Sequence, residues 1–258
     1  MTALRKLCTM AALLLVCGWA ASAGTPRYAC TVEKEFKHDA GSYTQGLFFY
    51  GGHLYESAGQ YGQSSMRIVD LETGKVLKRK NFGRQYFIEG SCVCGGKLYI
   101  LSWRENTCFV CDPSTLETIG ILRYPGEGWG LTTDGVSLIM SDGSSCITFL
   151  NPANLAVQRT IEVTLGGKKV MMLNELEYID GEIWSNVYGT DYIVRIDAAT
   201  GEVNSVVDCT GLLPQSLRKP STDVLNGIAL DPSDGSIYVT GKLWPKLYRI
   251  SARQLIKK

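Results

Sequence analysis

The stretch Gly52-His-Leu-Tyr-Glu-Ser57 is the first of five similar stretches that decide the fold. In each, a glycine is followed by a short alternating strand and then by small residues. The other four are Gly96-Lys-Leu-Tyr-Ile-Leu-Ser102, Gly135-Val-Ser-Leu-Ile-Met-Ser141, Gly181-Glu-Ile-Trp-Ser-Asn186 and Gly235-Ser-Ile-Tyr-Val-Thr240. The glycines lie 44, 39, 46 and 54 residues apart. Spacings of this size are typical of the four-stranded blades of a β-propeller.

A second marker lies between these stretches and begins with Asp or Asn. It occurs four times, as Asp70-Leu-Glu-Thr-Gly74, Asp112-Pro-Ser-Thr-Leu116, Asn151-Pro-Ala-Asn-Leu155 and Asp197-Ala-Ala-Thr-Gly201. Such residues favour turns because the short side chain bonds to nearby backbone. Each unit therefore reads as strand, turn, strand, Asp-turn and strand.

This repeat predicts an all-β fold, a five-bladed β-propeller. The rival is a six-bladed propeller with one degenerate repeat, for which a mature chain of about 235 residues leaves little room. A two-sheet sandwich would not repeat at this period. We expect the strand at Tyr28–Phe36 to pair with Leu247–Ile250 and to close the ring.

The composition excludes several classes of protein. The chain has 258 residues, 45% of them hydrophobic, and its 26 Lys+Arg balance 25 Asp+Glu. A disordered chain is less hydrophobic and more highly charged. Nucleic-acid binders usually carry a basic excess, so we expect no nucleic-acid partner. The 28 glycines and 8 prolines fit many turns rather than a collagen-like or low-complexity chain.

Residues 1–23 have the features of a secretory signal peptide. Arg5 and Lys6 precede an apolar stretch that ends at the small-residue site Ala21-Ser22-Ala23. The apolar stretch is shorter than the ~20 residues of a membrane-spanning helix, which disfavours an uncleaved anchor. Lipid attachment at Cys17 is a weaker alternative, because Val16 is larger than the residue that such processing prefers. We expect a single exported domain over residues 24–258, periplasmic or secreted, monomeric and without stable membrane insertion.

Seven cysteines remain after that cleavage, an odd number that leaves at least one thiol unpaired. Cys108 and Cys111 have the spacing of a redox motif, but they lie in an apolar strand-like run with no helix after it. Buried apolar residues or one local disulfide are the simpler interpretation. The only histidines, His38 and His53, are far from this pair, so we predict no zinc site there and no metal or cofactor elsewhere.

Several short polar or aromatic runs stand at the start of successive units. They contain, at corresponding positions, Gln45, Glu89, Trp129, Asn174 and Asn226. Inner strands of a propeller converge on its axis, so these five residues should form a ring around one mouth of the channel. The structural alternative is that the polar side chains only bond to backbone and that the glycines after them let the strands pack closely.

Glu89 is the strongest candidate for chemistry in this ring. It follows Phe87 and Ile88, and a carboxylate in an apolar mouth is costly to ionise. Its pKa should therefore rise, which suits general acid–base catalysis near neutral pH. Lys242 follows an inner-type strand and could reach the same mouth, or could be a solvated loop lysine. Trp103 and Trp129 are pocket or core residues.

Eight ordered motifs, between about residues 35 and 250, resemble the plant and bacterial type of glutaminyl-peptide cyclotransferase. They include Tyr43-Thr-Gln-Gly-Leu47, Phe87-Ile-Glu-Gly90, Gly126-Glu-Gly-Trp-Gly-Leu-Thr132, Leu173-Asn-Glu-Leu-Glu-Tyr178, Asp223-Val-Leu-Asn-Gly-Ile-Ala229 and Val239-Thr-Gly-Lys-Leu-Trp-Pro245. The resemblance implies a five-bladed propeller that needs no zinc. It also implies an acyltransferase that converts N-terminal glutamine of peptides or proteins to pyroglutamate and releases ammonia.

The resemblance also assigns roles to individual residues. Glu89 would be the acid/base, Asn174 and Lys242 would hold the γ-carbonyl or the oxyanion, and Gln45 would contact the substrate backbone. The pocket walls would be Tyr43, Phe87, Trp103, Trp129 and Tyr188.

Two residues depart from the family pattern, Tyr188 where Trp is frequent and Ile88 where Gly is common. These departures keep open a non-catalytic propeller that binds peptides or envelope partners. A metal-dependent, lactonase-like propeller would need several ligands at the channel, and Asn174, Glu175, Asn226 and Asp223 keep that third possibility open.

Overall fold

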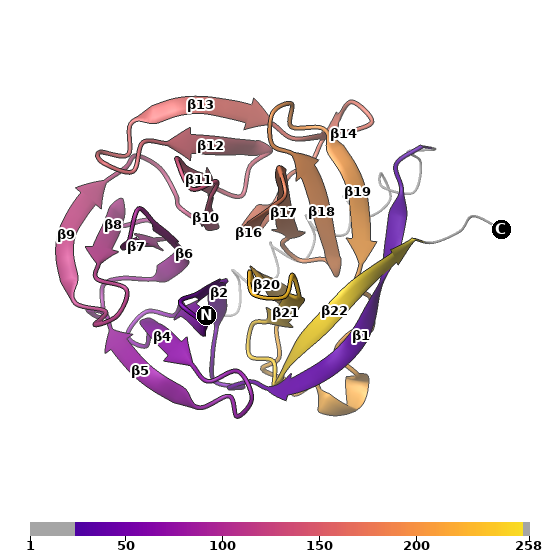
Figure 1. Cartoon of the computed structure of the whole chain (residues 1–258), viewed down its shortest axis with the longest axis horizontal. Coiled ribbons are helices and arrows are strands. Elements are labelled where there is room, and N and C mark those ends of the chain that lie inside the picture. Colours follow the sequence, from indigo (N-terminus) through magenta and orange to yellow (C-terminus); the bar gives the residue numbers. More distant parts are fainter. Residues whose placement is uncertain (1–23, 255–258) are drawn as a thin grey trace.

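A computed structural model describes residues 24–254, and the predicted signal peptide and its cleavage site lie outside this range. Within the range the chain is all-β, apart from one short 3-10 helix, η2 (Gln215–Leu217). The sheets are arranged around a common centre, as in a β-propeller (Figure 1). No helix among the described residues is long and apolar enough to cross a membrane.

Three four-stranded antiparallel sheets follow one another along the chain. The first contains β2 (Thr44–Tyr50), β3 (His53–Ala58), β4 (Ser65–Val69) and β5 (Val76–Asn81). The second contains β6 (Ile88–Cys94), β7 (Lys97–Ser102), β8 (Thr107–Cys111) and β9 (Thr118–Arg123). The third contains β10 (Leu131–Thr133), β11 (Leu138–Ser141), β12 (Cys146–Leu150) and β13 (Val157–Glu162).

The remaining long strands form one eight-stranded sheet, in the order β16-β17-β18-β19-β1-β22-β21-β20. Its strands are β16 (Leu173–Ile179), β17 (Glu182–Val187), β18 (Tyr192–Asp197), β19 (Val203–Asp208), β20 (Leu225–Leu230), β21 (Ile237–Gly241), β22 (Lys246–Gln254) and β1 (Arg27–Lys37). A small hairpin of β14 (Thr164–Leu165) and β15 (Lys168–Lys169) lies between β13 and β16 in the chain.

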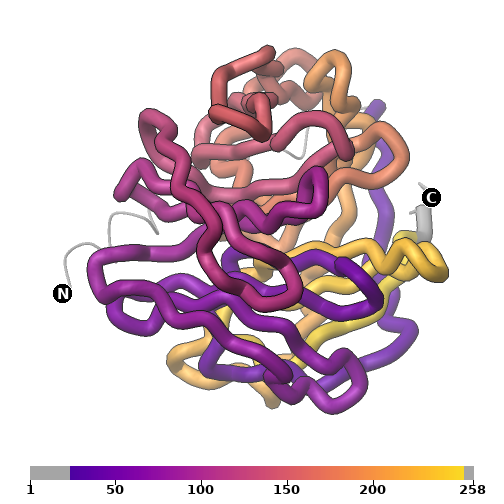
Figure 2. The backbone as a smooth tube through the Cα atoms, turned by 60° about the vertical axis from the view of Figure 1, so that its left-hand side comes forward, coloured from indigo at the N-terminus to yellow at the C-terminus, as the bar shows by residue number. Residues whose placement is uncertain are grey.

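Strand β1 joins the two ends of the described chain. It pairs antiparallel with β22, where Phe36 lies opposite Leu247, and parallel with β19. Figure 2 shows the indigo N-terminal strand beside the yellow C-terminal one. The predicted pairing of the terminal strands is therefore confirmed.

The Asp and Asn markers form the turns between the third and fourth strands of their units. Asp70 Oδ1 accepts the backbone N–H of Thr73 at 2.9 Å, and Asp112 Oδ1 accepts those of Ser114 and Thr115 at 2.9 and 2.8 Å. These contacts are the side-chain-to-backbone bonds expected of such turns. They end one strand and direct the chain back along the same sheet.

The strands nearest the centre are β2, β6, β10, β16 and β20 (Figure 1). Glycines let these strands approach one another closely. A Cβ added at Gly130 would lie 2.8 Å from the carbonyl carbon of Asn174 and 3.0 Å from Cα of Glu175. Real Cβ atoms almost never come so near to backbone atoms, so only glycine fits at this position.

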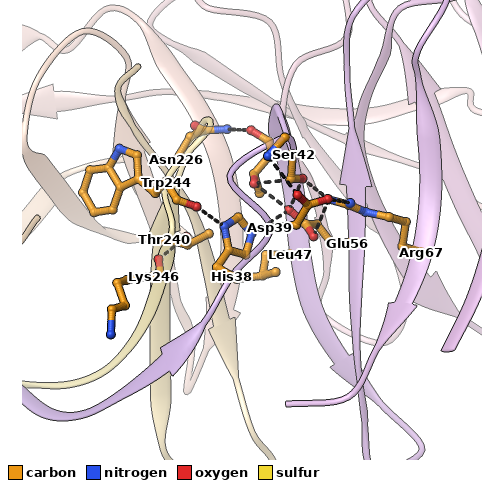
Figure 3. A network of polar contacts seen from close by, with 12 residues as sticks. His38, Asp39, Ser42, Leu47, Glu56, Arg67, Asn226, Thr240, Trp244 and Lys246 are labelled. Atoms are coloured by element: carbon orange, nitrogen blue, oxygen red, sulfur yellow. Dashed lines mark hydrogen bonds and ion pairs between the residues drawn. The ribbon is translucent and has the colours of Figure 1, made fainter. Parts of the chain in front are cut away.

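A buried polar network ties β1 and the loop after β21 to the first sheet (Figure 3). His38, just after β1, bonds through Nε2 to Glu56 at 3.0 Å and through Nδ1 to the carbonyl oxygen of Trp244 at 2.6 Å. Arg67 binds Glu56 at 2.7 Å and Asp39 at 2.8 Å. Burial opposes ionisation of both His38 and Glu56. Nevertheless Glu56 raises the pKa of His38, while Arg67 and His38 lower the pKa of Glu56.

We predict that Gly130→Ala destabilises the protein by about 1–3 kcal/mol, because the added methyl group meets backbone that cannot move aside. Gly120 in the outer strand β9 is the matched control, since a Cβ there would meet only Val110, at 3.8 Å. Chemical denaturation measures both changes. Equal stability of the two variants would contradict the close approach of β10 and β16.

We also predict that Glu56→Gln lowers the free energy of unfolding by about 3–5 kcal/mol, because Arg67 loses its buried carboxylate partner and keeps only the half-exposed carboxylate of Asp39. Glu72→Gln removes an exposed partner of Lys34, 2.8 Å away, and should cost less than about 1 kcal/mol. Urea denaturation at neutral pH compares the two variants. A similar small loss in both would show that the buried network does not hold the first sheet to β1.

Candidate functional site

Four inner strands are irregular at the polar residue that the sequence singled out. The register of each strand against its neighbour shifts at this point; the residues are Gln45 in β2, Glu89 in β6, Asn174 in β16 and Asn226 in β20. A β-bulge changes the direction in which a side chain points, and such bulges are frequent beside active sites. The irregularities therefore explain how polar side chains at one position of each unit come to lie near the same centre.

Direct contacts join these residues around the centre. Asn226 Nδ2 donates to Gln45 Oε1 at 3.4 Å, and Gln45 Nε2 donates to Glu89 Oε1 at 3.1 Å. The next contact runs through the backbone, from the N–H of Gly90 to the carbonyl oxygen of Trp129 at 2.7 Å. Gly130 then packs against the backbone of Asn174. The five residues expected to be neighbours therefore follow one another around the centre of the propeller-like fold.

In each unit the residues just before the inner strand lie beside the residues just after the second strand, because the two strands are antiparallel. Backbone bonds of 2.8–2.9 Å join Trp103 to Phe87, Tyr188 to Met172 and Lys242 to Val224. Lys242 follows β21, which is the second strand of its unit and not an inner strand as the sequence analysis supposed. It reaches the centre because antiparallel neighbours place the end of one strand beside the start of the next.

Glu89 and Lys242 are ionisable groups of this site that are almost completely buried, since their residues are only 5% and 3% exposed. Burial raises the pKa of Glu89 well above its usual value, against the opposing effect of the Lys242 charge. Burial also lowers the pKa of Lys242 to about 8, although Glu89 and Asp223 favour its charged form. The same loss of hydration thus shifts the pKa of each group toward neutral pH.

Aromatic side chains surround the Lys242 ammonium. Its Nζ lies 4.9 Å from the ring centre of Tyr43 and 5.0 Å from that of Tyr188. The wall continues through edge-on contacts with centroid distances of 5.6–6.2 Å; the pairs are Tyr43–Phe87, Phe87–Trp103 and Trp129–Tyr188. These ring contacts form two groups, and the Lys242 ammonium lies close to a ring of each. The five aromatic residues predicted to line a pocket thus form an aromatic wall around Lys242.

Glu127 is a part of this wall that the sequence analysis did not single out. Its Oε2 accepts the indole N–H of Trp103 at 2.7 Å and that of Trp129 at 3.0 Å, while Arg104 binds its other oxygen at 2.8 Å. One carboxylate thereby fixes the orientation of both indoles. The sequence did contain a signal for Glu127, since it lies two residues before Trp129 in the same short run.

Asp223, a candidate metal ligand in the sequence, supports the wall. Its Oδ2 accepts the hydroxyl hydrogen of Tyr43 at 2.9 Å, and its Oδ1 accepts the N–H of Val224 at 2.9 Å. The side chain of Ile88, in contrast, belongs to the core with Phe48 and Met66. At this departure from the family pattern the side chain therefore packs into the core and not into the aromatic wall.

Three amide atoms near the centre are buried and have no hydrogen-bond partner among the described residues. They are Oδ1 of Asn174, Oδ1 of Asn226 and Nδ2 of Asn186. Buried polar atoms are normally paired, so these atoms have unused capacity to bind a ligand. Together with Glu89 and Lys242 they suit proton transfer on a polarised carbonyl group.

The described residues contain neither a disulfide bond nor a cluster of metal ligands. Cys108 and Cys111 are buried in β8 and, like the other five cysteines in residues 24–254, unpaired. Over the same range, no group of three His, Cys, Asp or Glu residues is placed to hold a metal ion.

Comparison with known proteins matches this architecture and these motifs to one family. The family model described as glutamine cyclotransferase matches residues 6–252. A glutaminyl-peptide cyclotransferase of Arabidopsis thaliana is 42% identical over 229 residues, which cover 86% of this chain and 71% of the relative. The crystal structure of Myxococcus xanthus glutaminyl cyclase superposes with a TM-score of 0.84 at 34% identity, covering 90% of this chain and all of that one. The chain belongs to the glutamine cyclotransferase family.

Proposed function

We propose that this protein is a glutaminyl-peptide cyclotransferase, an acyltransferase that converts the N-terminal glutamine of peptides or proteins to pyroglutamate. The observation that carries the proposal is the buried pair Glu89 and Lys242 within an aromatic wall, in a member of this family. The reaction needs a substrate folded back on itself, a neutral amine, a stabilised oxyanion and a protonated leaving group.

Glu89 moves the proton in this reaction. The α-amine nitrogen of the substrate attacks the γ-carbonyl carbon of the same residue, and the new C–N bond closes a five-membered ring. Glu89 accepts a proton from the amine and delivers one to the departing nitrogen, so that ammonia leaves as the old C–N bond breaks. Its raised pKa suits both steps near neutral pH. Gln45 contacts the substrate backbone, and its bond to Glu89, of 3.1 Å, also orients the Glu89 carboxyl group.

Lys242 and Asn174 stabilise the oxygen on which negative charge develops. A lysine ammonium without bulk water around it acts strongly on such a charge, because the local dielectric is low. Tyr43, Phe87, Trp103, Trp129 and Tyr188 form the pocket and exclude water that would otherwise hydrolyse the amide.

We further propose the finer architecture and setting of the enzyme. Counting the eight-stranded sheet as two blades joined through β1 gives five blades in one domain over residues 24–258. Residues 1–23 direct export to the periplasm or the medium, where the mature chain is a monomer. We also propose that catalysis is independent of a metal ion. Activity that survives strong chelators supports this, and a loss restored only by added metal would contradict it.

Replacement of Glu89 by Gln should lower kcat at least about 100-fold, because the variant cannot accept a proton. The assay follows ammonia release from a Gln-peptide or from glutamine β-naphthylamide. Glu175→Gln is the matched control, since Glu175 is equally buried on β16 but bonds to the backbone N–H groups of Leu47 and Ile228. Its kcat should stay within a few-fold of wild type.

Equal kcat in the wild type and the Glu89→Gln variant would reject the assignment of Glu89. A wild-type protein that binds Gln-peptides but releases no ammonia would instead be a non-catalytic binding propeller.

The kcat of the wild type should fall as the pH rises through about 8, because Lys242 then loses its proton and its charge. Lys242→Arg should move this alkaline limb upward by more than about one pH unit, since arginine stays protonated. Steady-state kinetics between pH 6 and 10 would measure the position of the limb, whatever the absolute rate of the variant. A limb at the same pH in both proteins would show that another group controls it.

A further inference from the structure

A cavity of about 580 Å³ lies beside the aromatic wall. Its lining comes from residues 189–191, 211–218 and 222–224. Binding sites for small molecules usually have volumes of about 300–1,000 Å³, so the cavity could hold one or two amino-acid residues of a peptide. None of the catalytic roles described above uses it.

The cavity and the catalytic mouth share walls. Asp223 lines the cavity and also holds the Tyr43 hydroxyl at 2.9 Å. Gly189, also in the lining, follows Tyr188, whose ring lies 5.0 Å from Lys242 Nζ. Two backbone bonds of 2.9–3.0 Å join Lys242 to Asp223 and Val224. A chain that extends from the mouth past Asp223 therefore enters this cavity.

Arg218 gives the cavity a cation that its surroundings leave available. The guanidinium lies 5.7 Å from the ring centre of Trp244, and among the described residues it takes part in no hydrogen bond or ion pair. Both oxygens of Asp223 already accept hydrogen bonds. Burial raises the pKa of Asp191, although the charge of Arg218 opposes this. Among the charged side chains of the lining, Arg218 thus has the most N–H donors available to bind a ligand.

The proposed reaction consumes only the amine and side chain of the first residue, and the rest of the peptide must leave the mouth. We propose that this cavity is the subsite for the residues that follow the cyclising glutamine, and that Arg218 binds their carbonyl or carboxylate oxygens. The guanidinium presents five N–H donors in a planar arrangement that matches a carboxylate. An acidic residue directly after the glutamine is therefore preferred. This inference rests on the proposed cyclase function.

The test compares kcat/KM for glutamine amide, which has no second residue, with that for Gln-Glu, Gln-Ala and Gln-Lys amides. We expect the wild type to prefer Gln-Glu over Gln-Lys by about tenfold. Arg218→Gln should remove this preference and leave glutamine amide unchanged, and Arg218→Lys should restore part of it. Arg84→Gln, at an exposed arginine elsewhere, is the control and should behave as wild type.

Three results would overturn the proposal. If Arg218→Gln changes nothing, the peptide does not use the cavity. If it lowers kcat/KM equally for all four substrates, Arg218 acts only through the packing of Trp244. If the wild type cyclises none of the substrates, the proposed function itself fails, and this inference fails with it. The glutamine amide measurement separates the last case from the first two.

Discussion

The close convergence of the inner strands is the constraint on which the rest of the structure depends. Glycines next to the inner polar residues bring neighbouring backbones within van der Waals contact, and the register shifts beside them point those side chains at one centre. The same crowding removes water. Glu89 and Lys242 are therefore buried where hydration cannot stabilise their charges, and the pKa of each shifts toward neutrality.

The buried network around Glu56 does not contact the proposed substrate site directly, but it holds residues next to that site in place. His38 holds the carbonyl oxygen of Trp244 (Figure 3). The N–H of Leu243 bonds to the carbonyl oxygen of Ser42 at 2.7 Å. These bonds fix Ser42, just before Tyr43, and Leu243 and Trp244, just after Lys242. The ends of the described chain, joined through β1, are thus fixed close to the residues proposed to bind the substrate.

Much of this arrangement could be predicted from the sequence, because its signals are local. The glycine and Asp markers have turn chemistry of their own, and their repetition placed Gln45, Glu89 and Asn174 at equivalent positions. The bonds of His38 to Glu56 and Trp244 could not be predicted, since they join distant segments without a shared pattern. The cavity lined by residues 211–218 did have a signal in the sequence, because these residues lie in the longest spacing, the 54 residues between Gly181 and Gly235.

The most direct test of this account is an NMR titration of the glutamate side-chain carboxyl groups in the wild type, with the Glu89 signal assigned by its loss in Glu89→Gln. If the converging strands deprive this residue of water, its carboxyl group should titrate well above the reference pKa of 4.5. A signal that titrates at or below 4.5 would show a hydrated or firmly paired carboxylate. It would contradict the claim that the packing of the inner strands prepares Glu89 for proton transfer.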